Sequence, residues 1–367
     1  MKKNYLLTVL FSALILIIYS CSKDEEAEEE YVPVSPVVVD LTQVPYPKLS
    51  DYHFFEGDMK DQIPSLNVIP YEPASTLFTD YASKKRFIWM PNGVKGTYVA
   101  DDKIIDFPVG TVLIKTFYYT TIQPSNTTKI IETRLMIRQS DGWKFHEYLW
   151  NEAQTDADLV LGEAFANGSA VNITFKKPNN EVINTNYRIP SDSECLACHK
   201  SNEIPTPIGL KPQNINVNYL YAEGSKNQLQ KLVEQGYLNS YPSNIVSTVN
   251  YKDTTQPLDL RVRSYLDINC AHCHIDNGRC DYRMVRFAFS ETTNPTNIGI
   301  CVSADEEISP TVTKIVTPGN FSKSVLHYRV ETSDESLMMP LIGRTIVHDE
   351  GVQLLEEWIA SLTQTCD

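Results

Sequence analysis

Two copies of one pentapeptide constrain this chain more than any other feature. The segments CLACH, residues 195–199, and CAHCH, residues 270–274, share the spacing C-x-x-C-H, and their first cysteines are 75 residues apart (270 − 195). This spacing is the attachment signature of c-type haem. Two cysteines three residues apart on a helical turn can each form a thioether with a haem vinyl group, and the next histidine then lies beneath the iron. The sequence therefore predicts two covalently bound haem c groups, attached through Cys195, Cys198, Cys270 and Cys273 and ligated through His199 and His274.

Two other chemistries also use paired cysteines. Four cysteines can bind a structural zinc ion, but zinc does not require a histidine after both pairs. A C-x-x-C redox pair is usually single and lies in a βαβ unit, a pattern that is absent from this sequence. Haem attachment is therefore the preferred interpretation of both motifs.

The N-terminus has the pattern of an export signal. Two lysines precede an uncharged apolar run over residues 5–19, which is shorter than the roughly 18 or more residues of a membrane-spanning helix. The next residues, Ser20-Cys21, resemble the end of the bacterial lipoprotein cleavage box, with an ordinary signal peptide as the alternative. This pattern predicts a signal peptide over residues 1–20 and lipidation of Cys21. The protein would then be an outer-membrane lipoprotein, on the periplasmic side or at the cell surface.

An acidic and proline-rich segment follows over residues 21–44. Its block of aspartate and glutamate repels itself and stays solvated, which is typical of a flexible tether. The whole chain has 32 Lys and Arg against 46 Asp and Glu, a formal net charge of −14. This balance excludes a nucleic-acid partner, because phosphate binding requires clustered cations. An acidic surface is also repelled by an anionic membrane surface, so membrane attachment is expected through the lipid anchor.

Residues 45–190 have the pattern of antiparallel strands. Apolar and polar side chains alternate over residues 131–138, and a Ser-Asp-Gly turn separates this run from an aromatic run over residues 143–150. Two further alternating runs, over 171–176 and 183–189, flank a Lys-Pro-Asn-Asn turn. These patterns predict a β-rich domain, built as an antiparallel sandwich or barrel.

After Pro190 the pattern changes to helices separated by polar connections. A capping box over residues 191–194 predicts the start of a helix that carries the first cysteines. Apolar spacing predicts a helix that Gly236 ends, one from Pro257 to Cys270, and a closing helix over 352–362.

This part divides into a first haem segment, residues 191–256, and a second haem domain, residues 257–367. The order within the second, a helix leading into CAHCH, then Met338-Met339-Pro340, then a closing helix, resembles a class I cytochrome c domain. In that family the methionine before proline binds iron opposite the histidine, so the resemblance implies Met339 as a haem ligand, with Met338 as the alternative. The expected fold class is multidomain α+β: a β-rich N-terminal domain followed by an α-helical, cytochrome c-like haem region.

The ligand opposite His199 stays open at this stage. No methionine lies between His199 and His274 in the sequence. The candidates elsewhere are Met90, Met136, His53 and His146, and a site open to water is a further alternative.

Three cysteines lie outside the two motifs and the lipoprotein box. Cys280 and Cys301 are 21 residues apart in one loop-rich segment (301 − 280) and could form a disulfide in an oxidising compartment. Cys366 would then be unpaired, or it would compete with one of them for the disulfide. The sequence alone does not decide between these pairings.

Six phrases along the chain together resemble one protein family. They are FPVGTVLIKTFYY, IETRLMIRQSDGWKF, YLWNEAQTDA, YRIPSDSECLACH, RVRSYLDINCAHCH and MMPLIGRTIVHDEGVQLLEEWI, within about residues 45–362. The family comprises exported bacterial dihaem c-type cytochromes with an N-terminal β-rich region. The resemblance implies the cysteines and histidines of both motifs, and Met339, as haem-binding residues. It also suggests an exported protein of parallel β-helix repeats as a partner.

The expected function is electron transfer between extracytoplasmic redox partners, an unidentified donor and an unidentified acceptor. An acidic surface favours a basic partner in weak, salt-sensitive encounters. A haem enzyme of the dihaem-peroxidase type is one alternative, although its motifs lie farther apart than the 75 residues found here. The other alternative is that the β-rich domain binds a ligand and the haem groups form an attached electron-transfer unit.

Overall fold

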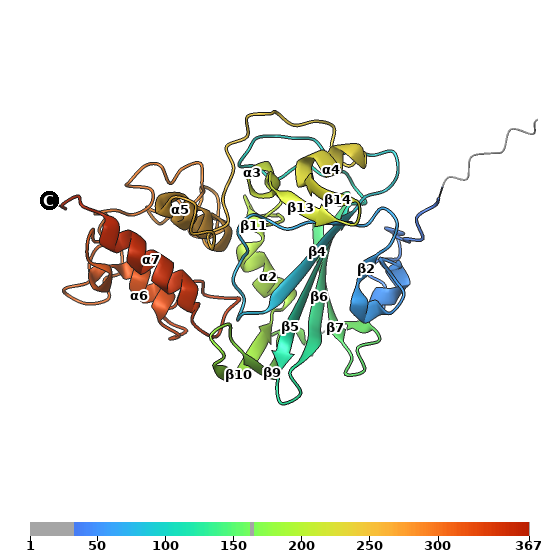
Figure 1. Cartoon of the computed structure of the whole chain (residues 1–367), viewed down its shortest axis with the longest axis horizontal. Helices are drawn as coiled ribbons and strands as arrows, with labels where there is room; N and C mark the ends of the chain where they lie inside the picture. The colour runs from blue at the N-terminus through green and yellow to red at the C-terminus, as the bar shows by residue number, and fades with distance from the viewer. Residues whose placement is uncertain (1–32, 162–164, 367) are drawn as a thin grey trace, which may run out of the picture. The chain divides into compact units, whose positions relative to one another are not determined.

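An eight-stranded antiparallel sheet organises the chain before the first motif (Figure 1). The computed structural model describes residues 33–161 and 165–366, and the chain from Pro36 onward forms one compact unit. The predicted signal peptide, Cys21 and the first part of the predicted tether lie outside the described residues.

Three long strands form the centre of this sheet. Strand β5 pairs with β6 on one side, and on its other side with β4 along most of its length and with β9 at Ile122. The hairpins expected from the alternating runs are present, since β6 pairs with β7 and β9 pairs with β10. The eight strands are β3 (Ile69–Pro70), β4 (Ser83–Trp89), β5 (Val112–Ile122), β6 (Thr127–Gln139), β7 (Gly142–Trp150), β8 (Ala157–Leu159), β9 (Ser169–Lys176) and β10 (Val182–Ile189).

Both faces of the sheet are covered by other parts of the chain. On one face, Ile114 and Leu135 are fully buried in a core that includes Leu49 and Tyr52 of the 3-10 helix η1 (Leu49–Tyr52). On the opposite face, Leu113 and Met136 belong to a core with side chains from α4 (Gln228–Glu234). We call this second side the inner face, because the first C-x-x-C-H motif also lies on it.

Most of the remaining described elements are short. Small strand pairs are β1 (Phe55–Glu56) with β2 (Ile63–Pro64), β11 (Lys200–Ser201) with β12 (Ile204–Pro205), and β13 (Asn218–Tyr221) with β14 (Gly224–Asn227). The helices besides η1 and α4 are η2 (Met59–Asp61), α2 (Asp192–Cys198), α3 (Pro212–Ile215), α5 (Leu258–Asn269), η4 (Phe321–Lys323), α6 (Val325–Glu331) and α7 (Asp349–Ser361). Apolar side chains of α5, α6 and α7 share one core, in which Leu266 and Leu355 are fully buried.

The predicted fold class is wrong. Helix accounts for only about 18% of the structure, and the described residues form no helical, cytochrome c-like region. Between Cys270 and Asp349 the described helices are η4 and the seven-residue α6. The apolar spacing that produces α5 and α7 stops between them, where turn-forming Asn, Pro, Ser, Thr and Gly are frequent. The β-rich part is an open sheet rather than a sandwich or barrel: its main path ends at β8 and β10, and a branch from β5 through β4 ends at β3.

His348 connects the start of α7 to the rest of the fold. Its Nδ1 lies 3.1 Å from the hydroxyl of Tyr265, its Nε2 lies 3.4 Å from that of Tyr251, and its ring stacks on Phe78 at 4.1 Å between centroids. The side chain is only 4% exposed. Burial, reinforced by Lys252 and Lys84, lowers the pKa of His348 from its ordinary 6.5 to about 3. The folded protein therefore holds this imidazole neutral at pH values where the unfolded chain protonates it.

This depressed pKa predicts an acid-dependent loss of stability. The stability that depends on a neutral His348 is fully present above pH 6.5 and is lost as the pH falls towards 3. Between these values the unfolded chain binds a proton at His348 and the folded protein does not. From pH 7 to pH 5 the loss should reach about 2 kcal/mol. Urea titrations at several pH values should therefore show a shallower pH dependence for His348→Gln than for the wild type. The exposed His53→Gln variant serves as control, and equal slopes for all three proteins would contradict the assignment.

Candidate haem-binding site

The second motif lies in the turn that ends α5. The backbone N–H groups of Cys273 and His274 both donate to the carbonyl oxygen of Cys270, at 3.1 and 3.0 Å. These bonds keep the two cysteines on one helical turn, which is the arrangement that attachment to a single haem requires. The ring of His274 then packs edge-on against Phe287, with 5.2 Å between the centroids.

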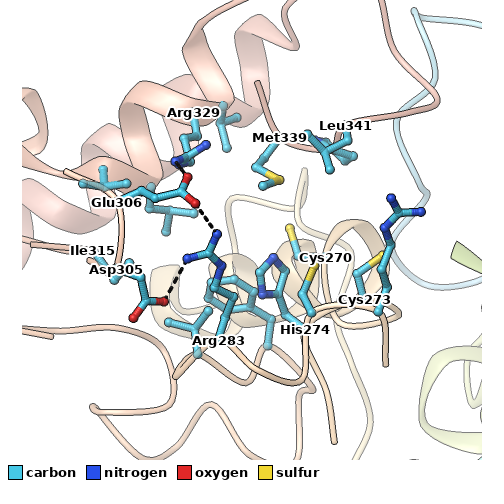
Figure 2. Close-up of a pocket in the computed structure, with 18 of the residues that line it drawn as sticks. Cys270, Cys273, His274, Arg283, Asp305, Glu306, Ile315, Arg329, Met339 and Leu341 are labelled. Atoms are coloured by element: carbon cyan, nitrogen blue, oxygen red, sulfur yellow. Dashed lines mark hydrogen bonds and ion pairs between the residues drawn. The ribbon is translucent and has the colours of Figure 1, made fainter. Parts of the chain in front are cut away.

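A cavity of about 290 Å³ opens beside this turn (Figure 2). Its volume is just below the range for ligand pockets, which begins at about 300 Å³. Cys270, Cys273 and His274 all line it. The apolar part of the wall includes Val285, Phe287, Ile315, Val325, Leu326, Val330, Leu341 and Ile342.

Met339 reaches the same cavity from the loop before α7. Its N–H donates to the carbonyl oxygen of Arg329 at 2.7 Å, and its own carbonyl accepts from Nε of Arg344 at 3.0 Å, so the backbone is held on both sides. Figure 2 shows the Met339 side chain facing Cys270 and His274 across the cavity. Met338 is buried and is not part of the cavity wall. The structure thus brings together the four residues expected around the second haem.

Ion pairs fix the polar side of the cavity (Figure 2). Arg283 donates to Asp305 at 3.1 Å and to Glu306 at 2.7 Å, and Arg329 donates to the second oxygen of Glu306 at 3.2 Å. This network joins the loop after the second motif to α6. Sequence reasoning did not identify these residues, because their ion pairs depend on the path of irregular loops.

The first motif is carried by α2, on the inner face of the sheet. The predicted capping box is present: the N–H of Ser191 donates to the Glu194 carboxylate at 2.9 Å, and the Ser191 side chain accepts from the N–H of Glu194. The Cys195 thiol lies 3.1 Å from Oε1 of Glu147 on β7. The His199 ring contacts Phe145 of the same strand at 5.2 Å between centroids.

The hydrogen bond of His199 selects a tautomer suited to metal binding. Its Nδ1 lies 3.1 Å from the carbonyl oxygen of Thr206, so Nδ1 carries the proton and Nε2 keeps its lone pair. In the second motif, Nδ1 of His274 is buried with no hydrogen-bond partner among the described residues. Burial lowers the pKa of His199 to about 3 and that of His274 to about 4. Both imidazoles are therefore neutral, as metal ligands must be.

Burial acts in the opposite direction on the acidic groups near α2. It raises the pKa of Glu147 from 4.5 to about 7, although the Cys195 hydrogen bond and Arg134 oppose the shift. It also raises the pKa of the Cys195 thiol, with the charge of Glu147 adding to the effect. Cys195 is therefore a neutral thiol near Glu147, which itself has a second oxygen without a hydrogen bond among the described residues.

The two motifs meet in space, although 75 residues separate them in sequence. The ligand atoms of Cys198, His272 and Cys273 all lie within 4.8 Å of one another. The Cys273 thiol also lies 3.8 Å from the carbonyl oxygen of Ala197, and the cavity wall includes both Ala197 and Cys198. Neither motif alone predicts this contact, because it depends on how α2 and the end of α5 pack.

The residues present fit haem c at both motifs in their chemistry. Each motif offers two thiols on one turn and a neutral histidine, and the second adds a largely apolar cavity with a methionine on its far side. The cavity extends to the first motif through Cys198. The fit rests on the donor set of both motifs and on the selected tautomer of His199.

The five alternatives for the ligand opposite His199 have different surroundings. Met136 pairs across the sheet with Phe145, which contacts the His199 ring. Met90 is fully buried in the core of the inner face, and His53 is exposed at the end of η1. Burial lowers the pKa of His146 to about 4, but its strand partner Leu135 belongs to the core of the opposite face of the sheet. The assignment of this ligand, or of water, stays open.

The predicted pairing of Cys280 with Cys301 is wrong. Cys301 forms a disulfide with Cys366, with a Cα–Cα distance of 5.2 Å. Cys280 is a buried free thiol in the wall of the cavity. The C-terminal tail after α7 returns to the loop that contains Cys301, and sequence separation gives no indication of that return.

No family model matches this chain, and neither a curated protein nor a solved structure matches it. Within residues 33–161 and 165–366, no helix has the length and apolar character needed to cross a membrane.

Proposed function

We propose that this protein is an electron-transfer protein with two covalently attached haem c groups. The observation that carries the proposal is the meeting of the two C-x-x-C-H motifs at one cavity. Cys270, Cys273 and His274 of the second motif line it together with Cys198 of the first, and Met339 lies on the side facing His274. When bound, haem c would supply a one-electron iron couple at each motif. The expected alternatives, a peroxidase-type enzyme and a ligand-binding β-rich domain, gain no specific support from the arrangement of residues.

Each residue of the site has a distinct task in this proposal. Cys195, Cys198, Cys270 and Cys273 form the thioether links, and His199 and His274 ligate iron through Nε2. Met339 is the proposed second ligand at the second haem, and a methionine there raises the reduction potential relative to a histidine. The apolar wall around Phe287 and Leu326 would limit solvent access to the haem, and solvent access is one of the factors that set its potential.

The contact between the motifs supports electron exchange within one chain. Cys198 and Cys273 belong to different motifs, yet their sulfur atoms lie within 4.8 Å of each other. Thioether links at these two positions would bring the edges of the two haems together. A short path between the two redox centres is what a protein that passes electrons through itself requires.

The surroundings of the protein complete the proposal. We place it as an outer-membrane lipoprotein anchored through Cys21, on the periplasmic side or at the cell surface, with residues 21–44 as the tether. Its redox donor and acceptor are unidentified, and an exported parallel β-helix repeat protein is a proposed partner. The net charge of −14 favours partners with a basic surface.

Haem content and attachment test this proposal directly. The protein would be expressed with a cytochrome c maturation system and analysed by the pyridine haemochrome assay together with peptide mass mapping. We expect two haems per chain, with one haem mass on the peptide that carries Cys195 and Cys198 and one on the peptide that carries Cys270 and Cys273. A product with free thiols at all four cysteines would overturn the proposal.

One specific cluster supports a second candidate function. Cys198, His272 and Cys273 offer two thiols and an imidazole at metal-binding distance, which suits a structural zinc ion with one further ligand. The same preparation separates the two candidates, because thioether formation consumes the thiols that zinc would need. Zinc at one equivalent, with no covalent haem, would favour this second candidate.

A further inference from the structure

A row of charged side chains crosses the inner face of the sheet beneath the first motif. Arg86 on β4 lies opposite Lys115 on β5, Lys115 lies opposite Arg134 on β6, and Arg134 lies opposite Glu147 on β7. Residues directly opposite in neighbouring strands share a face, so the row is continuous over four strands. Glu147 at its end is the residue that contacts the Cys195 thiol.

Positive charge exceeds negative charge in this row and its neighbours. The cations are Lys84, Arg86, Lys115 and Arg134, and the carboxylates on the same face are Glu132 and Glu147. Glu132 is already satisfied, because it accepts two bonds from Arg134, at 2.5 and 2.9 Å, and one from Tyr187 at 2.6 Å. Glu147 has a raised pKa of about 7, so it is only partly ionised near neutral pH. It therefore balances little of the positive charge of Lys84, Arg86 and Lys115.

Arg86 is the member of the row with the weakest anionic partner. Its side chain is 6% exposed, and its Nη1 has no hydrogen bond among the described residues. The carboxylate closest to it in an ion pair, that of Glu72, is 3.9 Å away and half exposed. Burying an arginine group without a hydrogen-bonded anion is unfavourable, so an anion bound at the free Nη1 would stabilise Arg86.

The two lysines are also without a carboxylate partner among the described residues. Lys84 donates to the carbonyl oxygen of Leu77 at 2.9 Å, and Lys115 lies over the Phe117 ring at 4.9 Å. Arg134 contacts the same ring at 4.5 Å, so three cations surround Phe117 when Lys84 at 5.9 Å is included. Burial and the neighbouring cations lower the pKa of both lysines well below the ordinary value. A bound anion would offset the free-energy cost of burying these charged ammonium groups.

We propose that Arg86 and Lys115, with Lys84 beside them, bind the propionate carboxylates of the haem attached at Cys195 and Cys198. This inference rests on the proposed haem function. Lys115 lies two strands from Glu147, about 10 Å at the usual strand spacing, which is comparable to the span of a porphyrin. The length of the row therefore allows a haem linked at Cys195, beside Glu147, to reach Lys115 with its propionate edge.

Reduction potentials test the inference. In a Cys270→Ala, Cys273→Ala background, which isolates the first haem, Lys115→Met and Arg86→Met should each lower the potential. Loss of a cation beside the propionates disfavours the reduced haem, and we expect about a tenfold change in the reduction equilibrium, ~59 mV for one electron. Arg86→Lys should restore much of the loss, because it keeps the charge.

Lys85→Met is the matched control, since Lys85 is on the same strand but bonds to the carbonyl oxygen of Asp61 on the other side of the sheet. Its potential should equal that of the background. If Arg86→Met fails to fold, the half-buried Lys115→Met decides the question. Covalent haem at Cys195 and Cys198 with an unchanged potential in Lys115→Met would overturn the inference and leave the proposed function intact. Absence of covalent haem at those cysteines in the wild type would overturn the proposed function itself.

Discussion

A variant with Cys270 and Cys273 both replaced by alanine is expected to retain one covalent haem per chain instead of two. Both cysteines lie on the turn that ends α5 and line the cavity, so their loss removes both thioether links at the second motif. The first motif is carried by a separate helix, α2, with its own capping box, and should still be loaded. The pyridine haemochrome absorbance per chain should therefore fall by half.

Cys280→Ala provides a matched control for this experiment. Cys280 is a free thiol in the wall of the same cavity, but it belongs to no C-x-x-C-H motif. It should keep two haems per chain, whereas a general loss of thiols or of folding would lower its haem content as well. A double variant of the second motif that still carries two covalent haems would show that the motif is not an attachment site.

Local features of this fold follow from local sequence. The alternating run before Ser140-Asp141 pairs as expected, because a period of two with a short polar turn specifies one register. The capping box at Ser191 and Glu194 begins α2 where the sequence predicts it. The attachment chemistry of both motifs depends on spacing along a single turn, so it too can be proposed from sequence.

Long-range arrangements could not be predicted in the same way. The contact of Cys198 with Cys273 and the row from Arg86 to Glu147 depend on the packing and register of elements that are distant in sequence. The prediction of a helical haem region was wrong for a related reason. A helix leading into CAHCH, a Met-Pro pair and a closing helix occur in the order of a class I cytochrome c domain, but they do not specify what lies between them. Between Cys270 and Asp349 the described chain forms mostly loops, with η4 and α6 as its helices.

Removal of the disulfide between Cys301 and Cys366 is expected to lower the free energy of unfolding by about 4 kcal/mol. The bond joins residues 65 apart in sequence, and a loop of that length restricts the unfolded chain strongly. The loop contains α6, α7 and Met339. Urea unfolding of the Cys301→Ala, Cys366→Ala variant should therefore show a clearly lower midpoint than the wild type.

Haem attachment should survive the same double substitution, and this separates stability from loading. Cys270 and Cys273 precede the disulfide loop, so the thioether links do not depend on it. Treatment of the wild type with a reductant should reproduce the lower midpoint, while the Cys280→Ala variant should respond to the reductant as the wild type does. Peptide mapping that links Cys280 to Cys301 would contradict the pairing, because Cys366 would then be free and the tail after α7 unconstrained.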